Sequence, residues 1–115
     1  MYDCIIIGAS VAGISAAINL KIRKKEFLLI GSKEFSPKVQ KAELIQNYVG
    51  MPDISGCELS GALEEHLQKM DIEITEARVN SIVKMGDNFM VSIGSDFFET
   101  KSVILATGVE FYKKI

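Results

Sequence analysis

The spacing of hydrophobic and polar residues changes along this chain, and each change predicts a different element. Residues 2–7 form an apolar run with three consecutive isoleucines, which is typical of a parallel strand covered on both faces. A helical period follows from residue 11 to about residue 23, and residues 26–30 give a second strand. This order predicts a right-handed βαβ unit. The helix is expected to pack on the sheet through Ala12, Ala16 and Leu20.

The middle of the chain predicts a long loop followed by a helix. Residues 31–51 have no regular period and are interrupted by Ser36-Pro37, with one short helical turn expected at 41–45. Ser55 and Glu58 have the spacing of a capping box, in which each side chain accepts a backbone hydrogen bond from the other residue. The helix that they begin is expected to bury Leu59, Leu63, Leu67 and Met70.

The last third of the chain predicts strands. Residues 72–75 alternate and give a third strand. Three short strands at 79–84, 88–93 and 97–101 are separated by glycine-containing turns and form an antiparallel meander. Residues 103–106 give a final buried strand. The fold class is therefore α/β, a Rossmann-like parallel sheet with a three-stranded antiparallel meander inserted between two of its strands.

The stretch from Gly8 to Gly13 lies between the first strand and the first helix. A helix N-terminus presents unpaired N–H groups and a partial positive charge, which attract phosphate. In a dinucleotide fingerprint the first glycine makes the turn, the second lets the backbone approach a pyrophosphate, and the third lets the helix pack on the strand. Gly8 and Gly13 fill the first and third places, and Ser10 stands in the second. The motif predicts a dinucleotide site.

Composition limits the other functions. The chain has 115 residues and a net charge of −2, so it is one domain or part of one, and neither nucleic acid nor an acidic membrane is indicated as a partner. No apolar run is long enough to span a membrane, and no signal peptide precedes the first strand. Cys4 and Cys57 have neither C-x-x-C nor metal spacing, which favours a reduced, cytoplasmic protein without a metal site. His66 and the basic residues 21–25 are expected to be solvated.

Four segments follow one another in an order typical of one group of flavoproteins. They are Tyr2-Asp3-x-Ile5-Ile6-Ile7-Gly8, Ala12-Gly13-Ile14-Ser15-Ala16-Ala17, Asn47-Tyr48-x-Gly50 with Ile54-Ser55-Gly56-x-Glu58-Leu59, and Val103-Ile104-Leu105-Ala106-Thr107-Gly108. On these segments the chain resembles the thioredoxin reductase family of flavoprotein disulfide reductases over nearly its whole length.

The resemblance implies FAD as the cofactor and assigns no catalytic acid or nucleophile to this chain. It implies that the glycine turn holds the pyrophosphate and that Ser32 and Lys33 contact the ribose. The backbone of Val79 would contact the adenine, while Asn47 and Thr107-Gly108 would approach the flavin. The implied cofactor-binding residues are Gly8, Ala9, Ser10, Val11, Ala12, Gly13, Gly31, Ser32, Lys33, Ala42, Ile45, Asn47, Val79, Ala106, Thr107 and Gly108.

Two departures from the family pattern resemble one branch of it. Gly31 stands where a conventional member has an acidic residue that binds ribose hydroxyls, and Ser36-Pro37-Lys38 stands in place of a Gly-Gly-Gln loop. Together with residues 41–50 they resemble the clostridial-type flavin thioredoxin reductases. That likeness implies electron transfer from ferredoxin and no working NADPH site.

Family members also have a second nucleotide-binding domain with a redox C-x-x-C, and a C-terminal segment that completes the flavin domain. Neither is present in this sequence. Residues 1–115 are therefore expected to be the N-terminal part of an FAD-binding domain, inactive alone. The parent protein would act on a thioredoxin-like disulfide.

Two other interpretations remain open. A nucleotide-binding module without chemistry is one, because Lys33 favours the 2′-phosphate of NADP. A fragment that folds without any ligand is the other. An incomplete sheet is expected to cover its exposed apolar surface by self-association, which predicts a homodimer.

Overall fold

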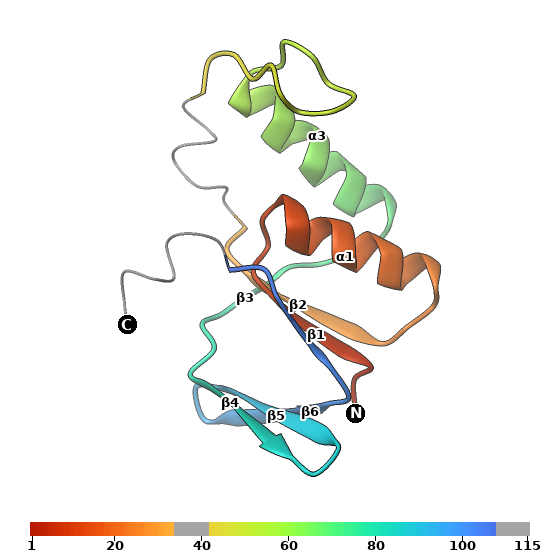
Figure 1. The fold of residues 1–115 in the computed structure, drawn as a ribbon, viewed down its shortest axis with the longest axis vertical. Coiled ribbons are helices and arrows are strands. Elements are labelled where there is room, and N and C mark those ends of the chain that lie inside the picture. Colours follow the sequence, from red (N-terminus) through yellow and green to blue (C-terminus); the bar gives the residue numbers. More distant parts are fainter. Residues whose placement is uncertain (34–41, 108–115) are drawn as a thin grey trace.

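The structure, a computed structural model, describes residues 1–33 and 42–107 of the chain and has two helices among seven strands (Figure 1). The element order confirms the predicted α/β class. The elements are β1 (Cys4–Ile7), α1 (Val11–Ile22), β2 (Phe27–Gly31), α3 (Gly56–Lys69), β3 (Thr75–Glu76), β4 (Ser81–Met85), β5 (Asn88–Ile93), β6 (Asp96–Thr100) and β7 (Val103–Leu105).

The strands form two sheets. Four parallel strands lie in the order β3-β2-β1-β7, and β4, β5 and β6 form a separate antiparallel meander. The meander connects β3 to β7, which lie at opposite edges of the parallel sheet. Both helices lie on one side of the parallel sheet and the meander lies on the other (Figure 1). The predicted insertion of a meander into a Rossmann-like sheet is confirmed.

Strand β1 is apolar throughout because it is covered on both faces. Successive side chains of a strand point to opposite faces. Cys4 and Ile6 belong to the core cluster under the helices, while Ile5 and Ile7 belong to the cluster that includes Val91 of the meander. All four residues of β1 are less than 5% exposed. The predicted buried positions of Cys4 and of the isoleucine run are therefore confirmed.

Helix α3 has the predicted cap and the predicted buried stripe. The Glu58 N–H donates to Ser55 Oγ at 3.1 Å, and the Ser55 N–H donates to Glu58 Oε1 at 3.3 Å. Leu59, Leu63 and Leu67 are buried, Met70 at the end of the helix is half-buried, and His66 is exposed.

The predicted packing face of α1 is only partly confirmed. Ala16 and Leu20 are half-buried and pack against the core cluster under the helices, but Ala12 is exposed. The buried residues of this helix are Gly13, Ile14 and Ala17. Apolar residues surround α1 almost completely, so their period did not identify the side that faces the sheet.

Several element boundaries also differ from the predictions. The third strand is only Thr75–Glu76, because Ile72 completes the end of α3, where its N–H donates to Leu67 O at 3.0 Å. The short helical turn is absent from the described residues 42–45, and Ile45 instead forms an antiparallel bridge with Ile54. The other shifts are of one or two residues: β1 begins at Cys4, α1 ends at Ile22, β2 is Phe27–Gly31, β4 is Ser81–Met85, β6 is Asp96–Thr100 and β7 ends at Leu105. The predicted burial of the last strand is wrong, because β7 is at the edge of the described sheet and its Ile104 and Leu105 are exposed.

Asp3 joins the starts of three elements. Its carboxylate accepts the Glu26 N–H at 2.9 Å and lies 3.4 Å from Lys101 Nζ, and its carbonyl oxygen accepts the Ser102 hydroxyl at 2.6 Å. The hydrogen bond from Glu26, with a further contribution from Lys101, lowers the pKa of Asp3 below its ordinary value. These contacts set the alignment of β1 with β2 and β7.

Lys24, just after the C-cap of α1, has an unfavourable backbone conformation, which gives a first testable prediction. Its φ is +58°, and the next N–H, that of Lys25, donates back to Leu20 O at 3.0 Å. This is the Schellman arrangement, in which glycine is preferred. Replacing Lys24 with glycine is expected to raise the free energy of unfolding by about 0.5–1 kcal/mol in urea denaturation, because the left-handed region strains other residues. Lys25→Gly is the control, since φ of Lys25 is not positive. Equal effects of the two substitutions would contradict this explanation.

Candidate nucleotide-binding site

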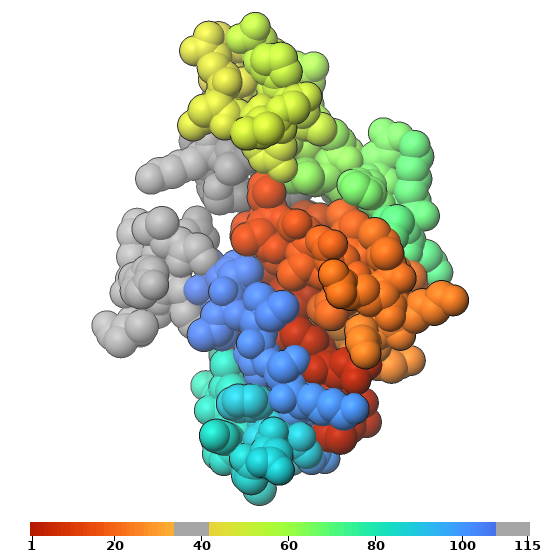
Figure 2. Space-filling model, turned by 45° about the vertical axis from the view of Figure 1, so that its right-hand side comes forward, coloured from red at the N-terminus to blue at the C-terminus, as the bar shows by residue number. Residues whose placement is uncertain are grey.

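The carboxyl ends of β1 and β7 mark the place where a ligand is expected. From β1 the chain continues to β2 and β3 on one side, whereas β7 lies on the other side of β1. Open α/β sheets bind ligands outside the carboxyl ends of their strands, where the strand order reverses. In the space-filling view the end of β7 lies against the start of α1 at this point (Figure 2).

Gly8 and Gly13 fit a turn that has no room for side chains. Gly8 has a φ of +113°, and a Cβ on it would lie 2.0 Å from Ala106 O. A Cβ on Gly13 would lie 1.8 Å from Gly8 O, so the start of α1 packs directly on the turn. This is the contact expected of the third glycine of a dinucleotide fingerprint. The turn leaves the first N–H groups of α1 without helical partners, as at any helix start, and they can bind an anion.

Gly31 lies against the same turn. A Cβ on Gly31 would lie 2.6 Å from Ala9 N and 2.7 Å from Ala9 Cβ. The end of β2 therefore packs directly on the turn, and a glycine at this position has a steric reason. Ser32 and Lys33 follow β2 and are exposed.

A carboxylate that the sequence did not single out lies beside these residues. Glu76 Oε2 accepts the Lys33 N–H at 3.4 Å, and Glu76 pairs with Gly31 in the sheet register. The signal in the sequence was weak, because Glu76 lies one residue beyond the strand predicted at 72–75.

Val79 and Thr107 lie together on a small, mostly apolar cavity. Its volume is about 160 Å³, and its lining residues come from the ends of β1 and β7 and the start of β4: Ile7, Val79, Asn80, Ser81, Ile82, Leu105 and Thr107. The neighbouring Ala106 is fixed at both backbone groups, since its N–H donates to Ile7 O at 2.7 Å and its carbonyl accepts the Ser10 hydroxyl. The cavity adjoins the switch point of the sheet.

Three predicted site residues lie in the loop before α3. Ala42 O accepts the Gly56 N–H at 2.7 Å, and Ile45 packs against the core cluster that Ala9 and Val11 also contact. Asn47 is exposed. The contacts of Ala42 and Ile45 are structural, and contact of this loop with a cofactor stays a prediction. Gly108 and Ser36-Pro37-Lys38 lie outside the described residues.

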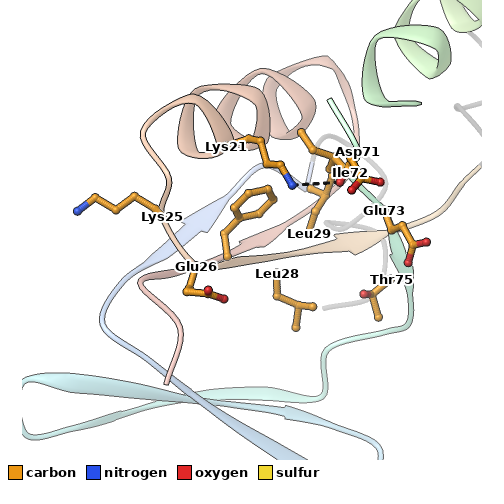
Figure 3. Close-up of a pocket in the computed structure, with 10 residues that line it drawn as sticks. Lys21, Lys25, Glu26, Leu28, Leu29, Asp71, Ile72, Glu73 and Thr75 are labelled. Carbon is orange, nitrogen blue, oxygen red and sulfur yellow. Dashed lines mark hydrogen bonds between the residues drawn. The ribbon is translucent and has the colours of Figure 1, made fainter. Parts of the chain in front are cut away.

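A second hollow among the described residues lies elsewhere. A groove of about 490 Å³ opens at the amino end of β2, where Lys21 Nζ donates to Asp71 O at 3.2 Å (Figure 3). Its other labelled residues include Leu28, Glu73 and Thr75. Because dinucleotides bind at the carboxyl ends of the strands, this groove is at the wrong end of the sheet.

The remaining candidates for chemistry are dispersed. Cys4 is buried in β1 and Cys57 is exposed in the first turn of α3, and both are free thiols. Within residues 1–33 and 42–107, no three His, Cys, Asp or Glu side chains are grouped so that they would hold a metal ion. Neither helix of these same residues is both long enough and apolar enough to cross a membrane.

Ser10 begins α1 but does not cap it, and this gives a second prediction. Its hydroxyl donates to Ala106 O at 3.4 Å, a long and exposed hydrogen bond, and its oxygen accepts no N–H from the helix. Ser10→Gly is expected to leave the affinity for ADP unchanged or to raise it, because glycine is the fingerprint residue and a good N-cap. Ser10→Val is the matched variant and is expected to weaken binding. A tenfold loss in Ser10→Gly by titration calorimetry would instead make the hydroxyl a phosphate ligand.

Comparison with known families agrees with the geometry. The family described as pyridine nucleotide-disulphide oxidoreductase matches residues 2–113. Thioredoxin reductase of Bacillus subtilis is 33% identical over 115 residues, which are 100% of this chain and 36% of that protein. Thioredoxin reductase of Treponema pallidum is also 33% identical, over 97% of this chain and 37% of its own length.

Solved structures are similar over the same region. A ferredoxin-flavin thioredoxin reductase from Clostridium acetobutylicum has 49% identity and a TM-score of 0.90, covering 96% of this chain and 38% of that one. Thioredoxin reductase of Lactococcus lactis has 33% identity and a TM-score of 0.82, covering 94% of this chain and 36% of that one. The chain thus spans little more than a third of the length of these relatives.

Proposed function

Because the chain belongs to the pyridine nucleotide-disulphide oxidoreductase family, we propose that it is the N-terminal part of an FAD-binding domain and holds the ADP half of FAD. The observation that supports this most is the turn from Gly8 to Gly13, which is packed between the ends of β2 and β7 with no room for a side chain at either glycine. Such a turn at a helix start fits a pyrophosphate.

The residues around the turn would bind different parts of the cofactor. The first N–H groups of α1 would bind the pyrophosphate, and Val79 would offer backbone groups to the adenine. Asn47 and Thr107 would approach the flavin. When bound, FAD supplies the redox chemistry, whereas the chain orients it and limits its contact with water.

The activity of the whole protein is part of the proposal. It would be a thioredoxin reductase-like enzyme that reduces a disulfide of a thioredoxin-like protein. Ferredoxin as its electron donor is supported by the 49% identity to the Clostridium acetobutylicum enzyme and by Gly31 at the place of the usual acid. This chain alone is expected to be inactive, since Cys4 and Cys57 lie in different elements and only one nucleotide fingerprint is present.

Self-association of the isolated chain is also proposed. Strand β7 is at the edge of the described parallel sheet, and Leu105 on it is 68% exposed. An exposed apolar edge strand favours pairing with another chain. A homodimer of the isolated chain is therefore expected.

The visible absorption spectrum of the purified chain tests the cofactor. After incubation with FAD and gel filtration, bound flavin absorbance is expected to elute with the protein. A colourless preparation that binds NADPH would contradict the proposal. For the whole protein, faster reduction of thioredoxin with NADPH than with reduced ferredoxin would reject the proposed donor alone.

A further inference from the structure

The end of β2 has no room for the acidic side chain that many dinucleotide sites use. An acid about twenty residues after the glycine turn ordinarily hydrogen-bonds the ribose hydroxyls. Here the corresponding residue is Gly31, and even a Cβ on it would lie 2.6 Å from the backbone nitrogen of Ala9. A carboxylate that meets the ribose must therefore come from another element.

Glu76 of β3 lies next to this position. It pairs with Gly31 across the parallel sheet, and its Oε2 accepts the Lys33 N–H at 3.4 Å. Its carboxylate thus reaches past the end of β2, on the carboxyl edge of the sheet. Glu76 is exposed, and an ionised carboxylate accepts about four hydrogen bonds, so acceptor sites remain for two ribose hydroxyls.

The chain after Glu76 leads toward the other end of the site. Ala77 and Val79 pack against the core cluster that contains Ile7 and Ile30, and Val79 lines the cavity at the ends of β1 and β7. Glu76 is thus the last residue of the outer strand β3, on the carboxyl edge of the sheet, and the chain runs from it to the segment proposed to meet the adenine. The ribose of an adenosine joins the adenine to the pyrophosphate and has to pass through this region.

We infer that Glu76 binds the hydroxyls of the adenosine ribose. From β3 it would replace the acidic side chain for which there is no room at position 31, at the end of β2. This inference rests on the proposed function. It also has a consequence for specificity: a carboxylate repels a 2′-phosphate, so the site selects ADP and FAD and rejects NADP. Lys33, which suggested a 2′-phosphate in the sequence, lies beside this negative charge.

The test compares ADP with 2′-deoxy-ADP by titration calorimetry of the full chain. The unmodified chain is expected to bind ADP at least about tenfold more tightly than 2′-deoxy-ADP, because a hydrogen bond to a charged group contributes about 1.5–3 kcal/mol. In Glu76→Ala the affinity for ADP falls by a similar factor and the preference over 2′-deoxy-ADP disappears. Glu73→Ala is the matched control, an exposed carboxylate three residues away in the groove at the amino end of β2.

The outcomes separate the two claims. Glu76→Gln removes the charge and keeps the shape, so it is expected to bind an ADP carrying a 2′-phosphate more tightly than the unmodified chain does. Retention of the full ADP preference in Glu76→Ala, or an equal loss in Glu73→Ala, would overturn the assignment of Glu76 while FAD binding stands. If the unmodified chain binds neither ADP nor FAD, the proposed function fails and the inference fails with it.

Discussion

Replacing Gly13 with alanine is expected to destabilise the chain severely and to abolish nucleotide binding. The added methyl carbon would lie 1.8 Å from Gly8 O, a backbone atom of a residue whose N–H donates to Ile30 O at 2.7 Å. Relief requires moving α1 off the sheet, which exposes Ile14 and Ala17. Overpacking of this kind ordinarily lowers the free energy of unfolding by about 1–3 kcal/mol. Because the obstacle is a backbone atom, the loss in Gly13→Ala is expected at or above the upper value. Urea unfolding and ADP titration of the same sample measure both effects.

Gly61 provides a matched control for this substitution. It lies within α3, and a Cβ on it meets nothing within 4 Å. Gly61→Ala is therefore expected to stabilise the chain by about 0.5–1 kcal/mol, which is the ordinary helix preference for alanine over glycine. Similar stabilities for Gly13→Ala and Gly61→Ala would show that α1 does not pack on the turn as described.

Restoring the family's usual acid by Gly31→Glu is expected to weaken FAD and ADP binding by more than tenfold. A comparison of sequences alone would suggest the opposite, since the acid binds ribose in conventional members. In this structure the side chain would begin 2.6 Å from Ala9 N and 2.7 Å from Ala9 Cβ, so the phosphate-binding turn must shift to admit it. Small displacements of a preorganised site reduce affinity strongly. Titration calorimetry with ADP gives the measurement.

Gly31→Ala shows whether the loss of ADP affinity in Gly31→Glu is caused by the added side-chain volume or by the added charge. It adds the same Cβ and no carboxylate, so it is expected to show most of the loss. Tighter ADP binding by Gly31→Glu would mean that the turn yields at little cost and that the acid is compatible with this fold. A normal affinity in Gly31→Ala with a loss only in Gly31→Glu would assign the effect to charge.

Local signals in the sequence predicted much of the fold. The isoleucine run, the glycine turn and the Ser55–Glu58 cap are each decided by neighbours within a few residues, and the structure has all three. The meander was predicted from the alternation of apolar and polar residues and from the glycine-containing turns between its strands. These elements sufficed to predict the α/β class and the glycine turn at the start of the first helix, whereas the strand order that defines the switch point came from the structure.

Features that depend on distant contacts were missed. The most buried residues of α1 were not predicted because the helix is apolar on most sides, and only contact with the sheet selects Gly13, Ile14 and Ala17. The reason for Gly31 is its contact with Ala9. Glu76 gains its position from pairing with Gly31 across the sheet, a register that no local pattern specifies.

Mapping of backbone amide NMR shifts during ADP titration tests the central claim most directly. The claim is that the ADP half of FAD binds at the carboxyl ends of β1, β2 and β7. The largest shifts are expected in the turn from Gly8 to Gly13, at Lys33, at Glu76 and at Val79, with little change around Lys21 and Asp71. Saturating shifts around Lys21, Asp71 and Glu73 with an unchanged glycine turn would contradict the claim and move the site to the groove at the amino end of β2.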